Sequence, residues 1–263
     1  MSNQIGGDLS PSTPQAVGSS TKTQRRPSLV PQLQRYTSRL SSIEQLPFNV
    51  DLQRHDEFTV EKGWKVDKSE TSLPAERPGD VEAHGSFSAA RGVLRDYRFP
   101  PPNLITGIFV PEGPLEQRVM LLRARFLFFT FYFGVRVSAV VDEERGVLDG
   151  KERVWGYRYA TLDGHFERGE IEFLIIKNLH AGDVRFTISS VSQTATIANI
   201  FYRFGFALFG RHLQLRFARE SLVRMRSLVE TELAQGTKAG AAPPVITATT
   251  AEPAAKAEMD QLT

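Results

Sequence analysis

The sequence predicts an α+β domain in which an antiparallel β-sheet packs against one long C-terminal helix. Between Leu104 and Ser192, segments rich in β-branched and aromatic residues alternate with short polar turns, which is typical of antiparallel strands. From Thr194 to Leu233 there is no proline, and apolar residues recur at spacings of four and three. This periodicity predicts an amphipathic helix whose apolar face covers the sheet.

The composition excludes several classes of protein. The chain has 263 residues, a net charge of +2 and no cysteine, so disulfides, thiolate catalysis and Cys-ligated metals are excluded. The N-terminus has no basic region followed by an apolar one, and the most apolar run, Phe126 to Val135, is shorter than the ~20 residues of a membrane-spanning helix. We therefore expect no signal peptide, no transmembrane segment and a cytoplasmic location.

Both ends of the chain have the composition of disordered segments. Residues 1–45 are rich in Ser, Thr, Pro and Gln, and residues 234–263 are rich in Ala, Thr, Pro and Lys, so neither can bury much apolar surface. The folded domain is expected over residues 46–233. One part of the first tail differs, because apolar residues between Leu29 and Ile43 recur at helical spacing; this part could form a short helix on the domain or fold onto a partner.

The first half of the domain contains one predicted helix. Ser86 is placed to cap a helix that carries Phe87, Ala90 and Leu94 on one face, and prolines after Phe99 end it. Before this helix, we expect a bent strand over 58–66 and a polar loop over 67–80. The strands of the second half are expected at 104–110, 118–129, 131–141, 153–161, 170–177 and 184–192, with a charged hairpin loop over 142–152.

The turn from Thr161 to Glu170 contains the most suggestive polar residues. A free imidazole titrates near neutral pH, and His165 stands close to Asp163, Glu167 and Glu170, so it could act as a general acid or base. The alternative is structural: the glycines of the turn provide positive φ angles, and the His165 ring bonds nearby backbone to hold the turn closed.

The same stretch resembles a known family pattern. Gly156-Tyr-Arg-Tyr-Ala-Thr-Leu162, Gly164-His165, Gly169-Glu170 and Phe173 resemble F-x-Y-x-T-L-x-G-H-P-x-x-G-E-x-x-F, which marks uncharacterised protein family 0548. The resemblance spans roughly residues 55–230. Phe166 stands where the family usually has Pro, and Ile171 where a second acid is common, so a shared acidic pair does not follow.

The order of elements is similar to that of the START-like and birch-pollen-allergen superfamily. This resemblance implies a helix-grip fold, in which a curved antiparallel sheet wraps around the long helix and encloses an apolar cavity. It implies that the domain binds a small apolar or amphipathic molecule between sheet and helix. The residues expected to contact that ligand are Tyr157, Tyr159, Thr161, Phe173, Phe201 and Phe204.

Two other functions compete with ligand binding. On the same fold, His165 and Glu170 could form an acid/base pair of an enzyme. Alternatively, the basic residues of the long helix could bind an anionic membrane as a peripheral or scaffold protein. The sequence does not favour nucleic acid, a cofactor or a metal, because the five histidines do not fall at ligand spacings, and it does not fix the oligomeric state.

Overall fold

The computed structural model describes residues 30–126, 129–194 and 200–239, and the side chains of residues 36–125, 130–194 and 211–236. Within this part, seven strands form one antiparallel sheet in the order β1-β7-β6-β5-β4-β3-β2. The strands are β1 (Lys65–Leu73), β2 (Ile105–Ile108), β3 (Val119–Phe126), β4 (Phe129–Val147), β5 (Gly150–Thr161), β6 (Glu167–Asn178) and β7 (Val184–Thr194). The helices are α1 (Val30–Glu44), α2 (Ser86–Arg95) and α3 (Ile200–Ala239), with short 3₁₀ turns η1 (His55–Glu57), η2 (Val60–Lys62) and η3 (Leu115–Gln117).

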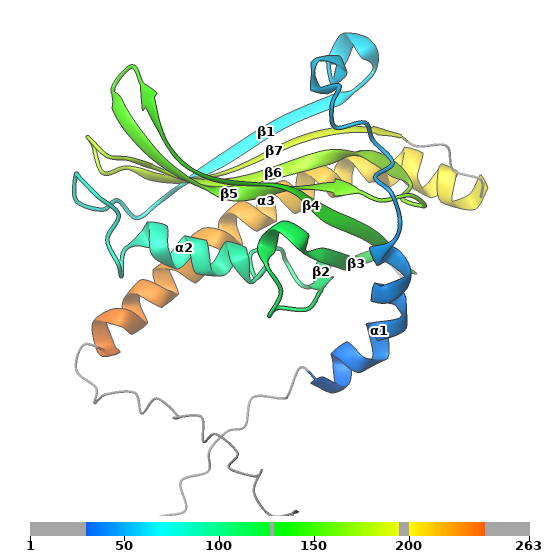
Figure 1. Ribbon diagram of the computed structural model, residues 1–263, viewed down its shortest axis with the longest axis horizontal. Helices are drawn as coiled ribbons and strands as arrows, with labels where there is room; N and C mark the ends of the chain where they lie inside the picture. Colours follow the sequence, from blue (N-terminus) through cyan, green and yellow to red (C-terminus); the bar gives the residue numbers. More distant parts are fainter. Residues whose placement is uncertain (1–29, 127–128, 195–199, 240–263) are drawn as a thin grey trace, which may run out of the picture.

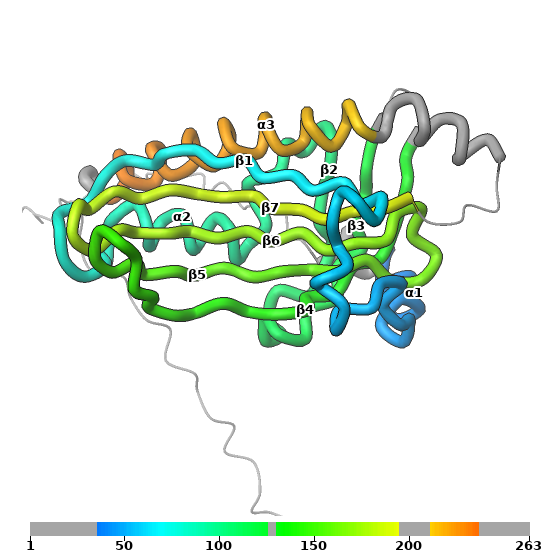
Figure 2. The backbone as a smooth tube through the Cα atoms, turned by 90° about the horizontal axis from the view of Figure 1, so that it is seen from above, coloured from blue at the N-terminus to red at the C-terminus, as the bar shows by residue number. Residues whose placement is uncertain are grey.

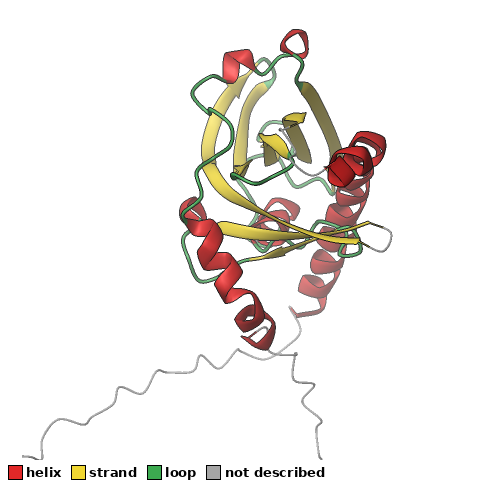
Figure 3. Cartoon of the chain, turned by 90° about the vertical axis from the view of Figure 1, so that its right-hand side faces the viewer, coloured by secondary structure: helices red, strands yellow, loops and turns green. Residues whose placement is uncertain are grey.

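The sheet curves, and its concave face is turned toward the helices. Figure 1 shows the sheet arching over α3, with α2 between the two, and Figure 3 shows the curvature from the side. Seen from above, β1, β7, β6, β5 and β4 lie side by side, with α3 running along the β1 edge (Figure 2). This arrangement confirms the predicted fold class, a curved antiparallel sheet around a long C-terminal helix.

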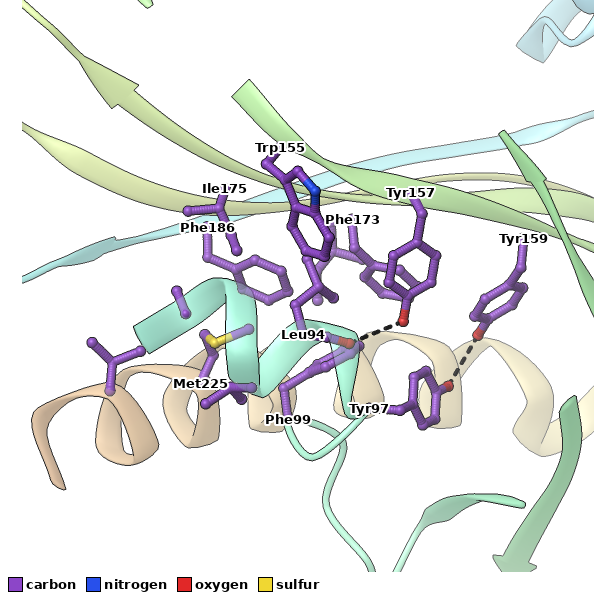
Figure 4. Packing of buried hydrophobic residues seen from close by; sticks show 14 of the residues in the cluster. Leu94, Tyr97, Phe99, Trp155, Tyr157, Tyr159, Phe173, Ile175, Phe186 and Met225 are labelled. Carbon is purple, nitrogen blue, oxygen red and sulfur yellow. Dashed lines mark hydrogen bonds between the residues drawn. The ribbon is translucent and has the colours of Figure 1, made fainter. Parts of the chain in front are cut away.

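The main core fills the concave face at one end of the sheet. Aromatic side chains of β5, β6 and β7 meet the apolar faces of α2 and α3 there, and their rings contact one another at tilted or edge-to-face angles (Figure 4). Each such side chain contributes about 1.5–3 kcal/mol when fully buried. The buried residues of this region include Leu94, Phe99, Trp155, Tyr157, Phe173, Ile175, Phe186 and Met225.

A second, smaller cluster lies on the opposite, convex face of the sheet. The segment that precedes β1 crosses this face, and Val50, Phe58 and Trp64 pack there with Ala160 of β5. Ala160 follows Tyr159, whose side chain points to the concave face, so the alternation of the strand turns Ala160 outward. The convex face of the sheet is therefore covered near Ala160.

Four expectations from the sequence were wrong. The bent strand expected over 58–66 does not form, because Val60–Lys62 is the 3₁₀ turn η2 and β1 begins only at Lys65. The polar loop expected over 67–80 begins instead as β1, in which exposed and half-buried residues alternate along the edge of the sheet. The charged loop expected over 142–152 belongs mostly to β4 and β5, since ion pairs such as Arg145–Glu152 connect the two strands. Ser86 is the first helical residue and not the cap; its hydroxyl donates to the Pro74 carbonyl at 2.5 Å.

The ends of the domain also differ from the predicted boundaries. Residues 30–44, inside the expected N-terminal tail, form α1, and Leu40 of this helix is buried. The helical alternative proposed for this segment therefore matches the structure. At the other end, α3 continues past 233 to Ala239. The remainder of both predicted tails lies outside the described residues.

A buried ion pair ties α2 to the sheet. Lys177 Nζ of β6 donates to Glu76 Oε2 at 2.8 Å and to the Asp80 carbonyl at 2.7 Å, and both charged side chains are almost fully buried. The other oxygen of Glu76 accepts the Phe87 N–H at 2.7 Å, at the start of α2, where a carboxylate stabilises the positive end of the helix. The pair therefore fixes where α2 begins relative to β6.

Replacing Lys177 should destabilise the domain strongly. Lys177→Met leaves the Glu76 carboxylate buried without its cation, so we expect the free energy of unfolding in urea to fall by about 3–5 kcal/mol. The double variant Lys177→Met, Glu76→Gln should regain part of this loss because no charge stays buried. The matched control, Arg226→Met, breaks the exposed Arg226–Glu230 pair and should cost less than about 1 kcal/mol. Equal losses for the two single variants would contradict this role of the pair.

Candidate functional site

A cavity of about 530 Å³ lies between the sheet and α3. It begins where the aromatic core ends, as the cross-strand register shows. Ile175 pairs with Phe186 in the core, the next inward pair, Phe173 and Ile188, lies at the border, and the following pair, Ile171 and Ser190, faces the cavity. The inner surface thus changes from packed core to open cavity within two steps along β6 and β7.

The two sides of the cavity differ in polarity. On the side of β2, β3 and β4, the lining is apolar apart from the exposed Arg125 of β3, and is formed by residues such as Leu104, Ile105, Leu122, Ala124, Phe133 and Val135. On the side of β1, β7 and the start of β6, it is polar, with Asp67, Ser69, Ser190, Ser192 and Glu167. Because these strands lie at opposite edges of one curved sheet, the cavity has an apolar half and a polar half.

The polar half contains a bond between the sheet and α3. Gln214 Nε2 donates to both carboxylate oxygens of Glu167 at 2.8 Å and also lies 3.3 Å from Ser192 Oγ. Lys65 Nζ lies 3.7 Å from Glu167 Oε1. Burial raises the pKa of Glu167, and Lys65 and Gln214 act against this rise. These bonds hold Gln214 of α3 against Glu167 at the start of β6.

The turn predicted from the sequence closes one end of this cavity. The Leu162 N–H donates to Gly134, the His165 N–H donates to Leu162, and the Thr161 hydroxyl accepts the Gly169 N–H at 3.0 Å. Gly164 has φ of +82°, a conformation that favours glycine in tight turns. At Gly169 a Cβ would lie 2.1 Å from the Val191 carbonyl oxygen, so only glycine lets β6 approach β7 this closely.

His165 lies in the wall of the cavity and is only 9% exposed. Its ring contacts Phe133 and Phe166, and its Nδ1 accepts the Glu167 N–H at 2.9 Å. Burial lowers the pKa of His165 to about 3, so the ring is neutral at physiological pH. The sequence offered, as the structural alternative, a His165 ring bonded to nearby backbone, and the bond at Nδ1 is such a contact. Because Nδ1 accepts this bond, the ring proton is on Nε2.

The structure does not bring Glu170 and His165 together. Glu170 lies opposite Ala160 in the β5–β6 ladder, and both side chains point to the convex face, whereas His165 lines the concave side. The Glu170 carboxylate accepts the Ser138 hydroxyl at 2.5 Å and lies 3.0 Å from His55 Nε2. Ser138 occupies a bulge of β4, which turns its hydroxyl toward this carboxylate. Both residues contribute to the lining of the cavity, but the Glu170 carboxylate bonds Ser138 and His55, and no hydrogen bond joins it to the His165 ring within the described part of the chain, so the acid/base pair stays a prediction.

The other predicted contact residues divide into two groups. Tyr159 and Thr161 line the cavity, but their hydroxyls bond Tyr97 (3.2 Å) and Asn49. Tyr157 and Phe173 are fully buried in the aromatic core, where the Tyr157 hydroxyl donates to the Leu94 carbonyl (Figure 4). The side chains of Phe201 and Phe204 lie outside the described residues, so their predicted role stays a prediction.

Sequence reasoning missed the polar half of the cavity. Gln214 was passed over because it lies beside the predicted apolar stripe of the helix. Met225 and Val229 of that stripe are fully buried, but Leu215 of the stripe is 49% exposed, whereas Phe217 and Ser221 beside it are buried. Ser190 and Ser192 carried a usable signal. They continue the alternation that begins with Phe186 and Ile188, and therefore share the concave face.

The basic residues of α3 are mostly paired within the domain. Arg211 bonds Asp67, Arg216 bonds Glu220 at 2.7 Å, and Arg226 bonds Glu230 at 2.9 Å. These contacts fit a solvated, ion-paired helix face better than a free cationic surface. Over the described residues, no helix is long and apolar enough to cross a membrane, and no group of three His, Asp or Glu side chains could hold a metal ion.

Residues 50–224 match the profile of a family described as a domain of unknown function, DUF1990. The chain belongs to this family. The match begins in the segment on the convex face, includes the whole sheet and ends within α3. No curated protein matches the chain.

Several solved structures are similar to this DUF1990 protein at low identity. They are TTHA0849 from Thermus thermophilus (13% identity, TM-score 0.39, 66% of this chain and 99% of that chain), Ara h 8.0201 (12%, 0.39, 65% and 99%) and the ZhuI aromatase/cyclase from Streptomyces sp. R1128 (15%, 0.38, 67% and 98%). At these TM-scores, the likeness assigns neither a ligand nor a reaction to the DUF1990 domain.

The buried His165 should make the stability of the DUF1990 domain depend on pH. The pKa is about 3 in the folded domain and 6.5 in the unfolded chain, so the stability that the neutral ring permits is complete above pH 6.5 and declines as pH falls toward 3. The slope is about 1.4 kcal/mol per pH unit, or about 2 kcal/mol between pH 6.5 and 5. Urea denaturation at a series of pH values measures it.

The comparison variant for this prediction is His165→Asn, whose side-chain oxygen can still accept the Glu167 N–H but does not titrate. Its free energy of unfolding should lack this decline. The exposed His84→Asn variant serves as the control and should follow the wild type. Parallel pH profiles for the wild type and His165→Asn would show that His165 is not buried in neutral form.

Proposed function

We propose that this DUF1990 domain binds a small apolar or amphipathic molecule in the cavity between the sheet and α3. The observation that carries the proposal is the cavity itself: about 530 Å³ falls within the roughly 300–1,000 Å³ of ordinary ligand sites. Its lining is mostly apolar with a few polar groups at one side, which is the usual composition of such sites.

The unfilled volume also argues for an occupant. Protein interiors pack as densely as organic crystals, and apolar side chains that border empty space lose contacts. In this domain the core beside the cavity is tightly packed, with Phe173 and Ile175 fully buried, whereas Phe133 and Ile171 are only partly buried and border the cavity. A ligand with an apolar body would restore the contacts that these side chains lack.

The polar half gives the ligand an orientation. Serine hydroxyls of β7, the Glu167–Gln214 pair and His165 all border the same space. An amphipathic ligand would place its polar group at this side and its apolar body against β2, β3 and β4. This proposal does not depend on three predictions from the sequence, which remain predictions: membership of uncharacterised protein family 0548, a cytoplasmic location and disordered tails.

Ligand binding should be visible in the full-length protein as purified. We expect native mass spectrometry to detect a co-purifying small molecule, and lipophilic compounds to raise the melting temperature. A ligand at a hundred times its Kd stabilises the folded state by about 2.7 kcal/mol. Absence of bound material, together with no stabilisation by any compound of a broad lipophilic panel, would contradict the proposal.

Filling the cavity should abolish binding. Ala218→Trp on α3 and Ala124→Trp on β3 each place an indole in the cavity from a different wall, so each should remove the ligand-induced rise in melting temperature. The matched control is Arg219→Trp, which adds the same side chain one residue further along α3 at an exposed position and should bind as the wild type does. Binding that survives both cavity variants would place the ligand elsewhere.

A further inference from the structure

One hydrogen-bond donor in the cavity wall is both about nine-tenths buried and without a partner within the described part of the chain. Tyr159 bonds Tyr97, Thr161 bonds Asn49, and the Gln214 amide N–H groups bond Glu167. The hydroxyls of Ser69 and Ser190 also have no partner among the described residues, but these side chains are only half-buried. His165 differs. Its Nδ1 is occupied by the Glu167 N–H, and Nε2, which carries the proton, bonds no described residue.

The Nε2–H group borders open space. Four side-chain atoms of the described residues are both fully buried and without a partner, namely Arg118 Nε, Arg123 Nε, Gln214 Oε1 and Ser221 Oγ. His165 Nε2 has no partner and is still not among them, which means that this atom is not fully buried, although the residue as a whole is about nine-tenths buried. The open space beside His165 is the cavity, whose lining includes this residue. The ring is also held in place, because Phe133 and Phe166 pack against it and the Nδ1 bond fixes its orientation.

A fixed N–H group in a mostly apolar cavity selects for an acceptor on the ligand. Burying such a donor without a partner is unfavourable, so a ligand oxygen that accepts from Nε2 gains relative to a hydrocarbon of the same shape. The neutral imidazole brings no positive charge to balance an anion. The carboxylate of Glu167 lies in the same wall, and Lys65 is already paired with it. The two arginines in the lining, Arg125 and Arg168, are both exposed to solvent, and Arg168 bonds Gln193. A carboxylate ligand would therefore meet like charge in a poorly solvated space.

We propose that His165 Nε2–H is the specificity-determining donor of this cavity and binds the acceptor oxygen of an uncharged lipophile, such as a ketone, ester or alcohol. This inference rests on the proposed ligand-binding function and names the class of ligand. The apolar body of the molecule lies against Leu122, Phe133 and Val135, and its oxygen lies at His165, between the apolar and the polar half.

A matched series of ligands tests this assignment. Octane, 2-octanone and octanoate each have eight carbons and differ in the oxygen-bearing group at or next to one end. Their affinities can be measured at pH 7.5 by displacement of the neutral fluorescent probe N-phenyl-naphthylamine from the full-length protein. We expect octanone to bind more tightly than octane by about five- to tenfold, the effect of one net hydrogen bond, and octanoate to bind more weakly than octanone.

The variants separate His165 from the rest of the wall. His165→Phe keeps an aromatic ring but has no donor, so the ratio of octanone to octane affinity should fall to about one while octane still binds. His165→Asn keeps the acceptor for the Glu167 N–H and removes the donor at the Nε2 position; it carries the test if the phenylalanine variant does not fold. His84→Phe, the same substitution at an exposed histidine outside the cavity lining, should leave the ratio as in the wild type.

The outcomes distinguish this inference from the proposed function. An unchanged ratio in both His165 variants, an equal loss of the ratio in His84→Phe, or tighter binding of octanoate than of octanone would overturn the role of His165, while the binding function would stand. If the wild type binds neither the probe nor any of the three compounds, both proposals fail.

Discussion

The concave face of the sheet extends beyond α2, so two helices cover only one end of it. At one end, α2 lies between the sheet and α3, and the inward rows from Trp155, Ile175 and Phe186 are buried without gaps. α2 ends at Arg95, where the buried Tyr97 and Phe99 follow, and beyond this point only α3 spans the curved sheet. A single helix cannot fill the width of such a sheet, so the space beyond α2 is the cavity.

The position of α2 therefore decides where the core stops and the site begins. That position is fixed by polar contacts in an otherwise apolar region. The Lys177–Glu76 pair joins β6 to the first turn of α2, and the hydroxyls of Tyr97 and Tyr159 join its end to β5. Tyr97 adopts φ of +52°, a conformation that costs energy in a residue with a side chain, and this conformation directs its ring to Tyr159.

The polar residues of the turn from Thr161 to Glu170 make contacts on both faces of the sheet. On the concave face, His165 is buried as a neutral ring, held by Phe133 and by the Glu167 N–H. On the convex face, Glu170 bonds Ser138 and His55, and so fastens the segment before β1 to the back of the sheet. Residues that are close in sequence thus belong to separate networks, because adjacent positions along a strand point to opposite sides.

The sequence by itself determined the class of fold and the order of its elements. Alternation along β5, β6 and β7 and the long apolar period of α3 are local patterns, and local patterns are enough to predict strands and helices. The glycines at 164 and 169 and the turn between them were predicted for the same reason.

Only the tertiary structure decided which side chains share a space: that Gln214 of α3 meets Glu167 of β6, that Glu170 faces away from His165, and that the cavity begins after Phe173. These facts depend on strand register, on the bulge at Ser138 and on the rotation of α3 about its axis, where Leu215 is exposed and Phe217 is buried. Each is set by contacts between distant segments, and no local pattern in the sequence specifies them.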